Sequence, residues 1–294
     1  MKHAYLIMAH NEPYILEKLL KLLDDEQNDI YIHVDLKVKD FDFAYYQNLC
    51  QKSNVYFTKR TDVSWGKFSQ IECELIVIEE AVKKKYDYYH LLSGVDLPLK
   101  SNKEINEFFE KNKGYEFVAF AKDKQNNVDR IKYYHYFVKN SSEKFYHIMH
   151  YLLIKIQKIL KINRLKNTDF TVKKGANWFS ITHDLATYVL TKKEFLYQHF
   201  QKSLCADELF LQTICYNSKF KKKIYNKYND EHLDIMRYID WNRSNGKSPW
   251  VFEINDKDIL LNSNMLFARK FSTKTKEQKE LVDYIFKTIN KKNK

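Results

Sequence analysis

The fold is decided by a stretch near the N-terminus, residues 4–13, which reads AYLIMAHNEP. Its first six residues are apolar and predict a buried strand that ends before His10. Asn11 can cap a helix and Pro13 is tolerated in a first helical turn, so we expect a helix to follow at once. A strand that leads directly into a helix is the first half of a β-α-β unit.

The same alternation of strand and helix continues through the first 120 residues. Apolar patterning predicts further strands at 30–34, 55–58, 88–92 and 116–120, and helices at 68–85 and 102–111. Repeated β-α-β units with short connections favour an α/β fold with a mostly parallel, Rossmann-like sheet and helices on both faces. Ligands bind such sheets beyond the carboxyl ends of the strands. His10, Asp35 and the stretch 93–96 lie at those ends and mark the expected site.

The second half of the chain is less regular. We expect helices at 145–160, from His183, at 207–216 and at 276–290, with a strand at 178–182 and a short strand or loop at 265–270. The sequence shows no internal repeat and no clear linker. A single domain over residues 1–294 is therefore expected.

Glycine is unusually rare in this chain of 294 residues, which has five: Gly66, Gly94, Gly114, Gly175 and Gly246. An average protein contains about 7% glycine. No two of the five are close together, which excludes a GxGxxG dinucleotide loop and a GxxxxGK[ST] phosphate loop. A phosphate group bound by this chain must therefore be held by side chains or by isolated backbone amides.

The four cysteines show no CxxC spacing, which argues against a zinc knuckle and a disulfide framework and suits a reducing compartment. No apolar run approaches the ~18 residues of a membrane-spanning helix. The apolar part of residues 1–8 is too short for a signal peptide and fits a strand. The expected location is the cytoplasm, with peripheral contact at the inner face of the cell membrane left open.

The chain is strongly basic, with a formal net charge of +12 and a pI of about 9.2. Such a surface favours anionic partners, namely nucleic acid, phospholipid headgroups or phosphorylated substrates. Residues 139–174 concentrate this charge, with nine Lys or Arg residues against two acids. The helix predicted at 145–160 either lies on anionic lipid or packs by its apolar stripe with its lysines in water.

Two pairs of charged residues are candidates for chemistry. Asp207-Glu208 at a predicted helix start fits a general base, which needs a carboxylate that faces a cleft, but acids there also complement the helix dipole. Arg269-Lys270 at a strand end fits the binding of a diphosphate and the stabilisation of a leaving group. With 50 Lys and Arg residues in the chain, such a pair also arises without function.

Polar residues at two further strand ends bear on nucleotide and metal binding. Asp35 fits hydrogen bonds to a uracil or ribose, or the capping of the next turn. The stretch Ser93 to Asp96 follows a strand, where nucleotide-sugar transferases commonly place a pair of acids around a metal. Only Asp96 is acidic here, and the D-x-D strings at 40–42 and 256–258 do not follow a central strand. A divalent cation needs several oxygen ligands, so no metal is expected.

Seven segments occur in an order that resembles one enzyme family. They are AYLIMAHNEP (4–13), IYIHVDLK (30–37), VSWGKFSQIECEL (63–75), HLLSGVDLPLKS (90–101), KGANWFSITHDLATYVL (174–190), ADELFLQTICYNS (206–218) and LFARKF (266–271). This order is similar to that of the core-2/I-branching β-1,6-N-acetylglucosaminyltransferase and peptide xylosyltransferase family, in a short bacterial form. Each motif is weak alone, but seven in order are hard to obtain by chance.

The resemblance implies a GT-A-like domain, with a nucleotide-binding half at 1–125 and an acceptor-binding half with the C-terminal helix at 126–294. It implies an inverting, metal-independent transfer of a sugar from a UDP-sugar to a glycan or a lipid-linked glycan, without a further cofactor. UDP-GlcNAc is the favoured donor, and UDP-xylose or another UDP-sugar is the alternative. A surface polysaccharide or glycan is the implied product.

The resemblance also implies roles for single residues. Glu208 takes the place of the catalytic base, and Lys270 that of the diphosphate-binding lysine, with Arg269 beside it. The implied donor side further comprises Ala9, His10, Asp35, Ser64, Trp65, Ser93, Gly94 and Asp96. The implied acceptor side comprises Trp178, Asp207, Arg130 and Trp241.

One stretch departs from the family pattern. Some members place a second basic residue on the diphosphate, upstream of the last pair, but the corresponding residues 248–252 contain no arginine. The second contact is then expected from Lys247, Arg237 or Arg269.

Two other classes of function fit parts of the sequence. A nucleic-acid-binding protein would explain the net charge and the 22 tyrosines. Four acids near the strand ends would repel nucleic-acid phosphates, however: Asp35, Asp96, Asp207 and Glu208. We therefore expect no nucleic-acid partner. An inactive sugar-binding relative of the transferases would keep the motifs without turnover.

Overall fold

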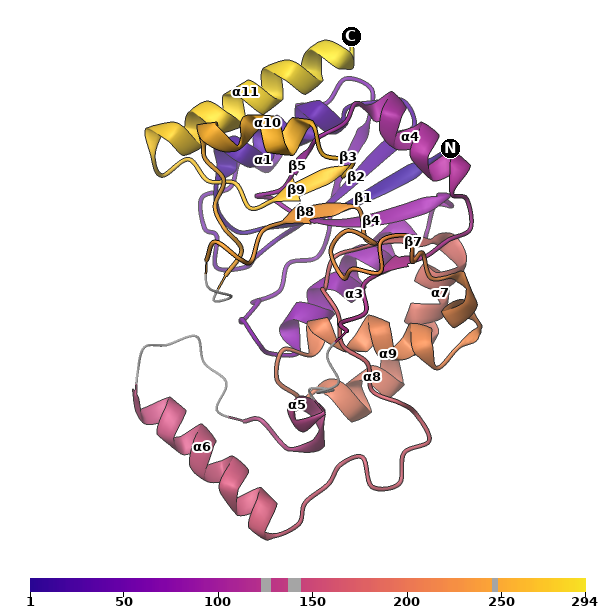
Figure 1. Cartoon of the computed structure of the whole chain (residues 1–294), viewed down its shortest axis with the longest axis vertical. Coiled ribbons are helices and arrows are strands. Elements are labelled where there is room, and N and C mark those ends of the chain that lie inside the picture. Colours follow the sequence, from indigo (N-terminus) through magenta and orange to yellow (C-terminus); the bar gives the residue numbers. More distant parts are fainter. Residues whose placement is uncertain (123–127, 137–143, 245–247) are drawn as a thin grey trace.

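A six-stranded sheet forms the centre of the molecule (Figure 1), in a computed structural model that describes residues 1–122, 128–136, 144–244 and 248–294. The strands lie in the order β3-β2-β1-β4-β7-β6. Their bounds are β1 His3–Ala9, β2 Asn28–Val34, β3 Asn54–Phe57, β4 Tyr88–Ser93, β6 Phe117–Val118 and β7 Phe179–Thr182. The pairs β1–β2, β1–β4 and β2–β3 are parallel, whereas β7 is antiparallel to both β4 and β6. The predicted α/β class with a mostly parallel sheet is confirmed.

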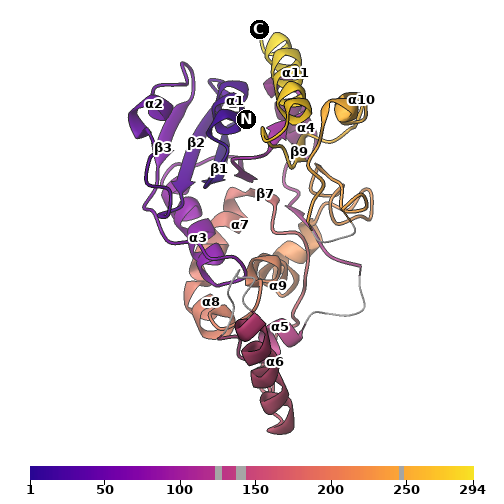
Figure 2. The same ribbon diagram turned by 90° about the vertical axis from the view of Figure 1, so that its left-hand side faces the viewer.

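Helices cover both faces of this sheet (Figure 2). One face packs against α1 (Pro13–Leu23), α4 (Asn102–Lys111) and α11 (Lys276–Lys292), and the core on the other contains α3 (Ser69–Ala81), α7 (His183–Thr191), α8 (Lys193–Phe200) and α9 (Phe210–Tyr216). Side chains alternate along β1, so that Tyr5 and Ile7 join the first core and Ala4 and Leu6 the second. Burial on both sides explains why this strand is apolar throughout.

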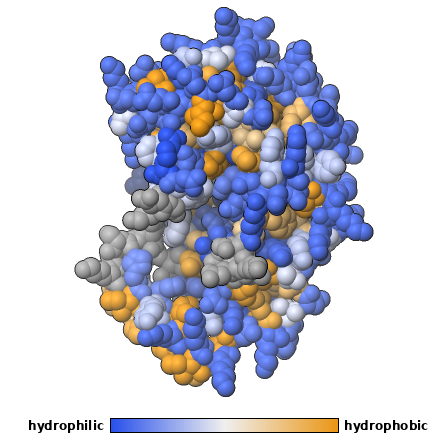
Figure 3. Space-filling model, viewed as in Figure 1, coloured by the Kyte–Doolittle hydropathy of each residue, from blue (hydrophilic) through white to orange (hydrophobic). Residues whose placement is uncertain are grey.

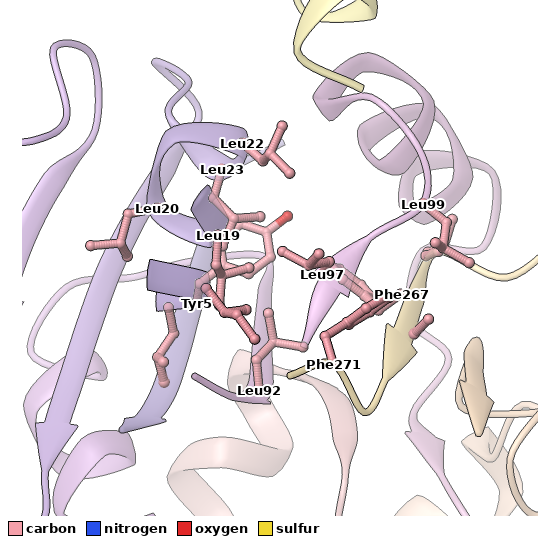
Figure 4. Packing of buried hydrophobic residues seen from close by; sticks show 14 of the residues in the cluster. Tyr5, Leu19, Leu20, Leu22, Leu23, Leu92, Leu97, Leu99, Phe267 and Phe271 are labelled. Atoms are coloured by element: carbon pink, nitrogen blue, oxygen red, sulfur yellow. The ribbon is translucent and has the colours of Figure 1, made fainter. Parts of the chain in front are cut away.

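A second, three-stranded sheet joins the C-terminal part of the chain to the centre. It contains β5 (Leu97–Pro98), β8 (Arg237–Ile239) and β9 (Phe267–Arg269) in the order β5-β9-β8. Phe267 lies in the core with Tyr5 and Leu97, and Phe271 joins the same cluster (Figure 4). Burial of one such aromatic side chain contributes about 1.5–3 kcal/mol. The packing of β9 thereby fixes the start of the Arg269-Lys270 pair.

The remaining helices are short or peripheral. They are α2 (Phe43–Gln47), α5 (Asp129–Lys132), α10 (Lys257–Leu261) and 3₁₀ turns at Ala206–Glu208, Lys219–Lys223 and Ile254–Asp256. Helix α6 (Lys144–Ile159) stands away from the sheet, at the end of the molecule opposite α11 in both views (Figures 1 and 2). Within the described ranges, no helix has the length and apolar character that a bilayer crossing requires.

The start of α1 differs from the prediction. Its cap is Glu12 and not Asn11, and Glu12 has a φ of 51°. The Glu12 carboxylate accepts hydrogen bonds from the hydroxyls of Ser272 and Thr273, at 2.6 Å each. A partner 260 residues away in the sequence therefore holds the turn after β1, which local patterning does not reveal.

Other boundaries follow the local patterns to different degrees. Helix α4 begins and ends where predicted because Ser101 and Glu104 form a capping box. The helix predicted at 207–216 begins instead as a 3₁₀ turn and becomes α-helical at Phe210. The helix predicted at 68–85 ends earlier, at Ala81.

Candidate active site

A large cavity opens at the carboxyl ends of β1, β2 and β4. Its volume is about 1510 Å³, above the ~300–1,000 Å³ of typical small-molecule sites, which leaves room for two substrates. Most predicted site residues line it: Ala9, His10, Asp35, Trp65, Ser93, Arg130, Trp178, Asp207, Glu208, Trp241, Arg269 and Lys270. Ser64, Gly94 and Asp96 are not among its lining residues. The cavity thus brings Glu208 and Lys270, from distant parts of the sequence, to one space.

The backbone of Glu208 is held by two loops. The amide of Gly175 donates to the Glu208 carbonyl at 3.0 Å, and the amide of Cys205 donates to the Gly66 carbonyl at 2.9 Å. A Cβ atom at position 175 would lie 2.0 Å from the carbonyl oxygen of Ala119, so only glycine fits there. This close approach explains the glycine in the KGANW segment and places Glu208 beside the sheet edge.

The carboxylate of Glu208 faces two cations. Its Oε2 atom accepts a hydrogen bond from Arg130 Nη1 at 2.6 Å and lies 3.8 Å from Lys174 Nζ. The side chain is 35% exposed, so it reaches the cavity. Within the described residues both ionic contacts are made to Oε2, which leaves Oε1 for a proton. Arg130, predicted on the acceptor side, lies next to the predicted base and orients it.

Asp207 lies beside Glu208 in a very different environment. It is buried, and its Oδ2 atom accepts a hydrogen bond from Gln70 Nε2 at 3.0 Å. Its Oδ1 atom has no hydrogen-bond partner within the described ranges. Burial, and then the neighbouring charge of Glu208, raise the pKa of Asp207 to about 7. Glu74 of α3 is fully buried, and burial followed by Asp207 raises its pKa well above the usual range.

Replacement of Asp207 by Asn is expected to change how stability depends on pH. The raised pKa means that the folded chain keeps a proton on Asp207 between about pH 4 and 7 that the unfolded chain loses. This contribution to stability is complete at low pH and is lost as the pH rises toward 7. The loss is a few kcal/mol, since one pKa unit corresponds to about 1.4 kcal/mol. Urea denaturation at several pH values measures the free energy of unfolding. This free energy should fall less steeply with rising pH in Asp207→Asn than in the parent chain.

The matched control for this prediction is Asp184→Asn, which removes an exposed carboxylate from α7. It should retain the pH dependence of the parent chain. If Asp207→Asn and the parent lose the same free energy of unfolding over this pH range, Asp207 does not hold the proton.

The cavity lining also carries cations at the end of β9. The guanidinium carbon of Arg269 lies 3.8 Å from the ring centroid of Trp178, and its Nη1 atom lies 3.7 Å from Asp96 Oδ1. Its Nε and Nη1 atoms have no hydrogen-bond partner in the described part of the chain. Burial, and then the charges of Arg269 and Lys274, lower the pKa of Lys270. Buried N–H donors and crowded positive charges of this kind favour an anionic ligand.

Asp96 differs from its predicted role. It is 1% exposed, and its Oδ2 atom accepts a hydrogen bond from the backbone amide of Ser93 at 2.9 Å. A direct contact with the donor does not fit this burial. The carboxylate lies instead next to Arg269, whose guanidinium it positions. Gly94 lies behind Ala9, since a Cβ atom at 94 would touch the Ala9 Cα at 3.6 Å.

Arg237 is also unsuited to the role considered for it. It is 1% exposed and donates to the Phe179 carbonyl at 3.1 Å and to Ser180 Oγ at 3.2 Å. These bonds tie the two sheets together, so Arg237 is not a diphosphate contact. Lys247 lies outside the described residues. Of the two candidates that the structure describes, Arg269 lines the cavity and Arg237 does not.

Comparison with known proteins identifies the family. The family model described as Branch, Core-2/I-Branching enzyme, matches residues 3–261. The chain belongs to the Core-2/I-branching enzyme family. Membership of this family confirms the predicted class of enzyme, a glycosyltransferase.

Curated relatives of this branching-family enzyme are distant in sequence. Human N-acetyllactosaminide β-1,6-N-acetylglucosaminyl-transferase is 24% identical over 92% of this chain and 68% of its own length. Xylosyltransferase 2 of Canis lupus familiaris is 24% identical over 96% of this chain and 33% of its own length. The chain therefore spans about two thirds of the first relative and a third of the second. Among solved structures, mouse xyloside xylosyltransferase 1 in its apo form has a TM-score of 0.38 at 10% identity, over 91% of this chain and 97% of that one.

The end of the cavity that the sequence predicted to bind the nucleotide is built from β1 and β2 in this branching-family enzyme. The Asp35 amide donates to the Ala9 carbonyl at 2.9 Å, and the Asp35 carboxylate lies 3.0 Å from Lys37 Nζ. Trp65 presents a ring that is 58% exposed beside these strand ends. Ser64 supports this loop, since its amide donates to Ser69 Oγ at 2.9 Å.

Several cavity residues escaped the sequence prediction, among them Lys274 and His232. Lys274 adds a third cation near Arg269 and Lys270, and His232 stacks on Trp241 with ring centroids 6.3 Å apart. Neither lies in a recognisable motif, so only the fold reveals them. Within the described ranges, no three His, Cys, Asp or Glu side chains form a group suited to a metal ion.

Proposed function

We propose that this branching-family enzyme is an inverting transferase that moves a sugar from a UDP-sugar to a hydroxyl group of a glycan, without a metal ion. The observation that carries the proposal is the shared cavity, which is lined by a carboxylate at Glu208 and by the cations Arg269 and Lys270. UDP-GlcNAc is the favoured donor, because N-acetylglucosaminyltransferases are among the relatives. UDP-xylose is the alternative, since xylosyltransferase 2 is also a relative.

The chemistry is a single in-line displacement at the anomeric carbon. The acceptor oxygen forms the new bond to that carbon while the bond from the carbon to the UDP oxygen breaks, which inverts the configuration. Glu208 takes the proton of the acceptor hydroxyl through Oε1, and Arg130 orients the carboxylate through its hydrogen bond to Oε2. The electron pair of the broken bond goes to the diphosphate, where Arg269 and Lys270 stabilise the charge.

Positive side chains are proposed to do what a divalent cation does in other transferases, because both supply positive potential at the leaving oxygens. Transfer is therefore expected to continue at an unchanged rate in excess EDTA, and added Mn²⁺ is expected not to raise it. The measurement is an initial rate with radiolabelled donor. Loss of transfer in EDTA with recovery by Mn²⁺ would reveal a metal site.

A panel of UDP-sugars tests the proposed function itself. Thermal shift with each UDP-sugar selects the donor, and transfer to a set of glycan acceptors then measures turnover. Binding without transfer or hydrolysis of any donor would favour an inactive sugar-binding relative. No donor binding together with salt-sensitive binding of RNA would favour the nucleic-acid alternative.

The proposed location is the cytoplasm. All four cysteines are free, and three of them are buried: Cys73, Cys205 and Cys215. Free buried thiols suit a reducing compartment.

A further inference from the structure

Helix α6 presents an apolar face to solvent. Six apolar side chains of the helix are exposed, and so is that of Leu160, which follows it. Their exposed fractions lie between 45% and 77%, and the six are Phe145, Ile148, Tyr151, Leu152, Ile156 and Ile159. Their spacing of three or four residues places most of them on one side of the helix. Figure 3 shows apolar surface gathered at this end of the molecule. The sequence alternative in which this stripe packs against the protein is therefore wrong for these residues.

The opposite side of α6 is fixed to the body of the enzyme. Gln157 is 3% exposed, and its side chain exchanges two hydrogen bonds with the backbone of Tyr134, at 2.8 and 2.9 Å. His150 stacks on His135 with ring centroids 5.1 Å apart. These contacts set the rotation of the helix, so the apolar face cannot turn inward without breaking them.

The charges around this face are positive. The sequence of α6 contains no Asp or Glu, and exposed lysines lie on the helix at Lys155 and Lys158 and beyond it at Lys161 and Lys166. Lys158 lies 3.5 Å from Asp129, which offsets one of these charges. A second copy of the same face would bring lysines together and repel, whereas anionic headgroups would neutralise them.

We propose that α6 docks on the surface of an anionic phospholipid bilayer. The apolar face enters the boundary between headgroups and acyl chains, and the lysines lie at the level of the lipid phosphates. The helix lies on the bilayer and does not span it. Helix α6 is hydrogen-bonded to Tyr134, in the segment that also carries the cavity residue Arg130. Docking therefore brings the cavity close to a surface where a lipid-linked glycan resides. The access to a lipid-linked glycan rests on the proposed function, whereas the docking on lipid does not depend on it.

Vesicle flotation with the full chain tests the docking. The probes are vesicles of phosphatidylcholine alone and of phosphatidylcholine mixed with phosphatidylglycerol. The parent chain should float with the anionic vesicles at low salt. At ~0.5 M NaCl it should bind them at least about tenfold less, because salt screens the attraction between the lysines and the headgroups. The triple variant Ile148→Gln, Leu152→Gln and Ile156→Gln should bind at least about tenfold less at low salt, because three apolar side chains no longer enter the bilayer.

The controls separate docking from misfolding and from catalysis. Glutamine is at least as good a helix former as isoleucine, so the triple variant should keep its circular dichroism and thermal midpoint. Ile259→Gln removes an equally exposed isoleucine, on α10, and should bind vesicles like the parent. Lys155→Gln with Lys158→Gln should lose the preference for anionic vesicles.

Three outcomes would overturn the proposal. The first is no flotation of the parent chain at low salt, and the second is unchanged flotation of the triple variant. The third is a parent dimer in sedimentation that the triple variant abolishes without any vesicle binding, which would assign the face to a second copy. Flotation needs no donor sugar, so its failure leaves the transferase proposal standing.

Discussion

Glu208→Gln is expected to lower the rate of sugar transfer by about a hundredfold or more, the usual effect of losing a general base. Glutamine keeps the size of the side chain and an oxygen that accepts from Arg130, but it cannot take a proton from the acceptor hydroxyl. Binding of UDP should be retained, because the proposed diphosphate contacts are Arg269 and Lys270. Turnover with a saturating donor, together with calorimetric binding of UDP, separates the two effects.

The matched control is Glu107→Gln, which makes the same chemical change at an exposed position of α4. It should transfer at the parent rate. Near-normal turnover in Glu208→Gln would remove Glu208 from the mechanism. A large drop in its thermal midpoint would show that the carboxylate acts through the fold.

Lys270→Ala is expected to lower turnover by about a hundredfold to a thousandfold, comparable with the loss of one donor to a developing negative charge. Lys270 shares its side of the cavity with Arg269 and Lys274, and burial together with these neighbours already lowers its pKa. Without a bound anion the crowding of positive charge is unfavourable, and in the proposed mechanism the negative charge that grows on UDP relieves it. The effect should therefore appear mainly in turnover, with a smaller weakening of donor binding.

Lys287→Ala, at an exposed position of α11, is the control for the loss of one lysine. Its rate should equal that of the parent chain. Should Lys270→Ala turn over normally and differ only in its KM for the donor, Lys270 would bind the ground state without assisting departure of UDP. Arg269 is a poorer test residue, because its guanidinium also packs on Trp178 and pairs with Asp96.

Much of the fold could be predicted because local patterns and tertiary burial agree in the first half of the chain. The apolar runs of β1, β2 and β4 are buried on both faces, and the Ser101 cap lies within three residues of its partner. The second sheet was largely missed because its strands have two or three residues. Such strands are defined by pairing across the fold, which sequence periodicity does not report.

The sequence predicted which residues lie in the candidate site, but it did not predict the contacts between them. Strand ends and motif positions indicated Glu208 and Lys270, and the cavity includes both. The ion pair between Arg130 and Glu208 spans 78 residues of sequence, and the burial of Asp96 depends on neighbours from β9. Interactions of this kind follow from how distant segments meet, so residue spacing carries no trace of them.

The hydrogen bonds from Ser272 and Thr273 to Glu12 have a consequence for synthesis of the protein. The first strands present their ends early, but the cations that face them come from residues 269–274. A nascent chain on the ribosome therefore carries only part of the cavity lining until those residues emerge and form their hydrogen bonds with Glu12. Under the proposed function, nucleotide binding is therefore expected only late in translation, and fragments that end before residue 269 are expected to lack the cations that assist departure of UDP.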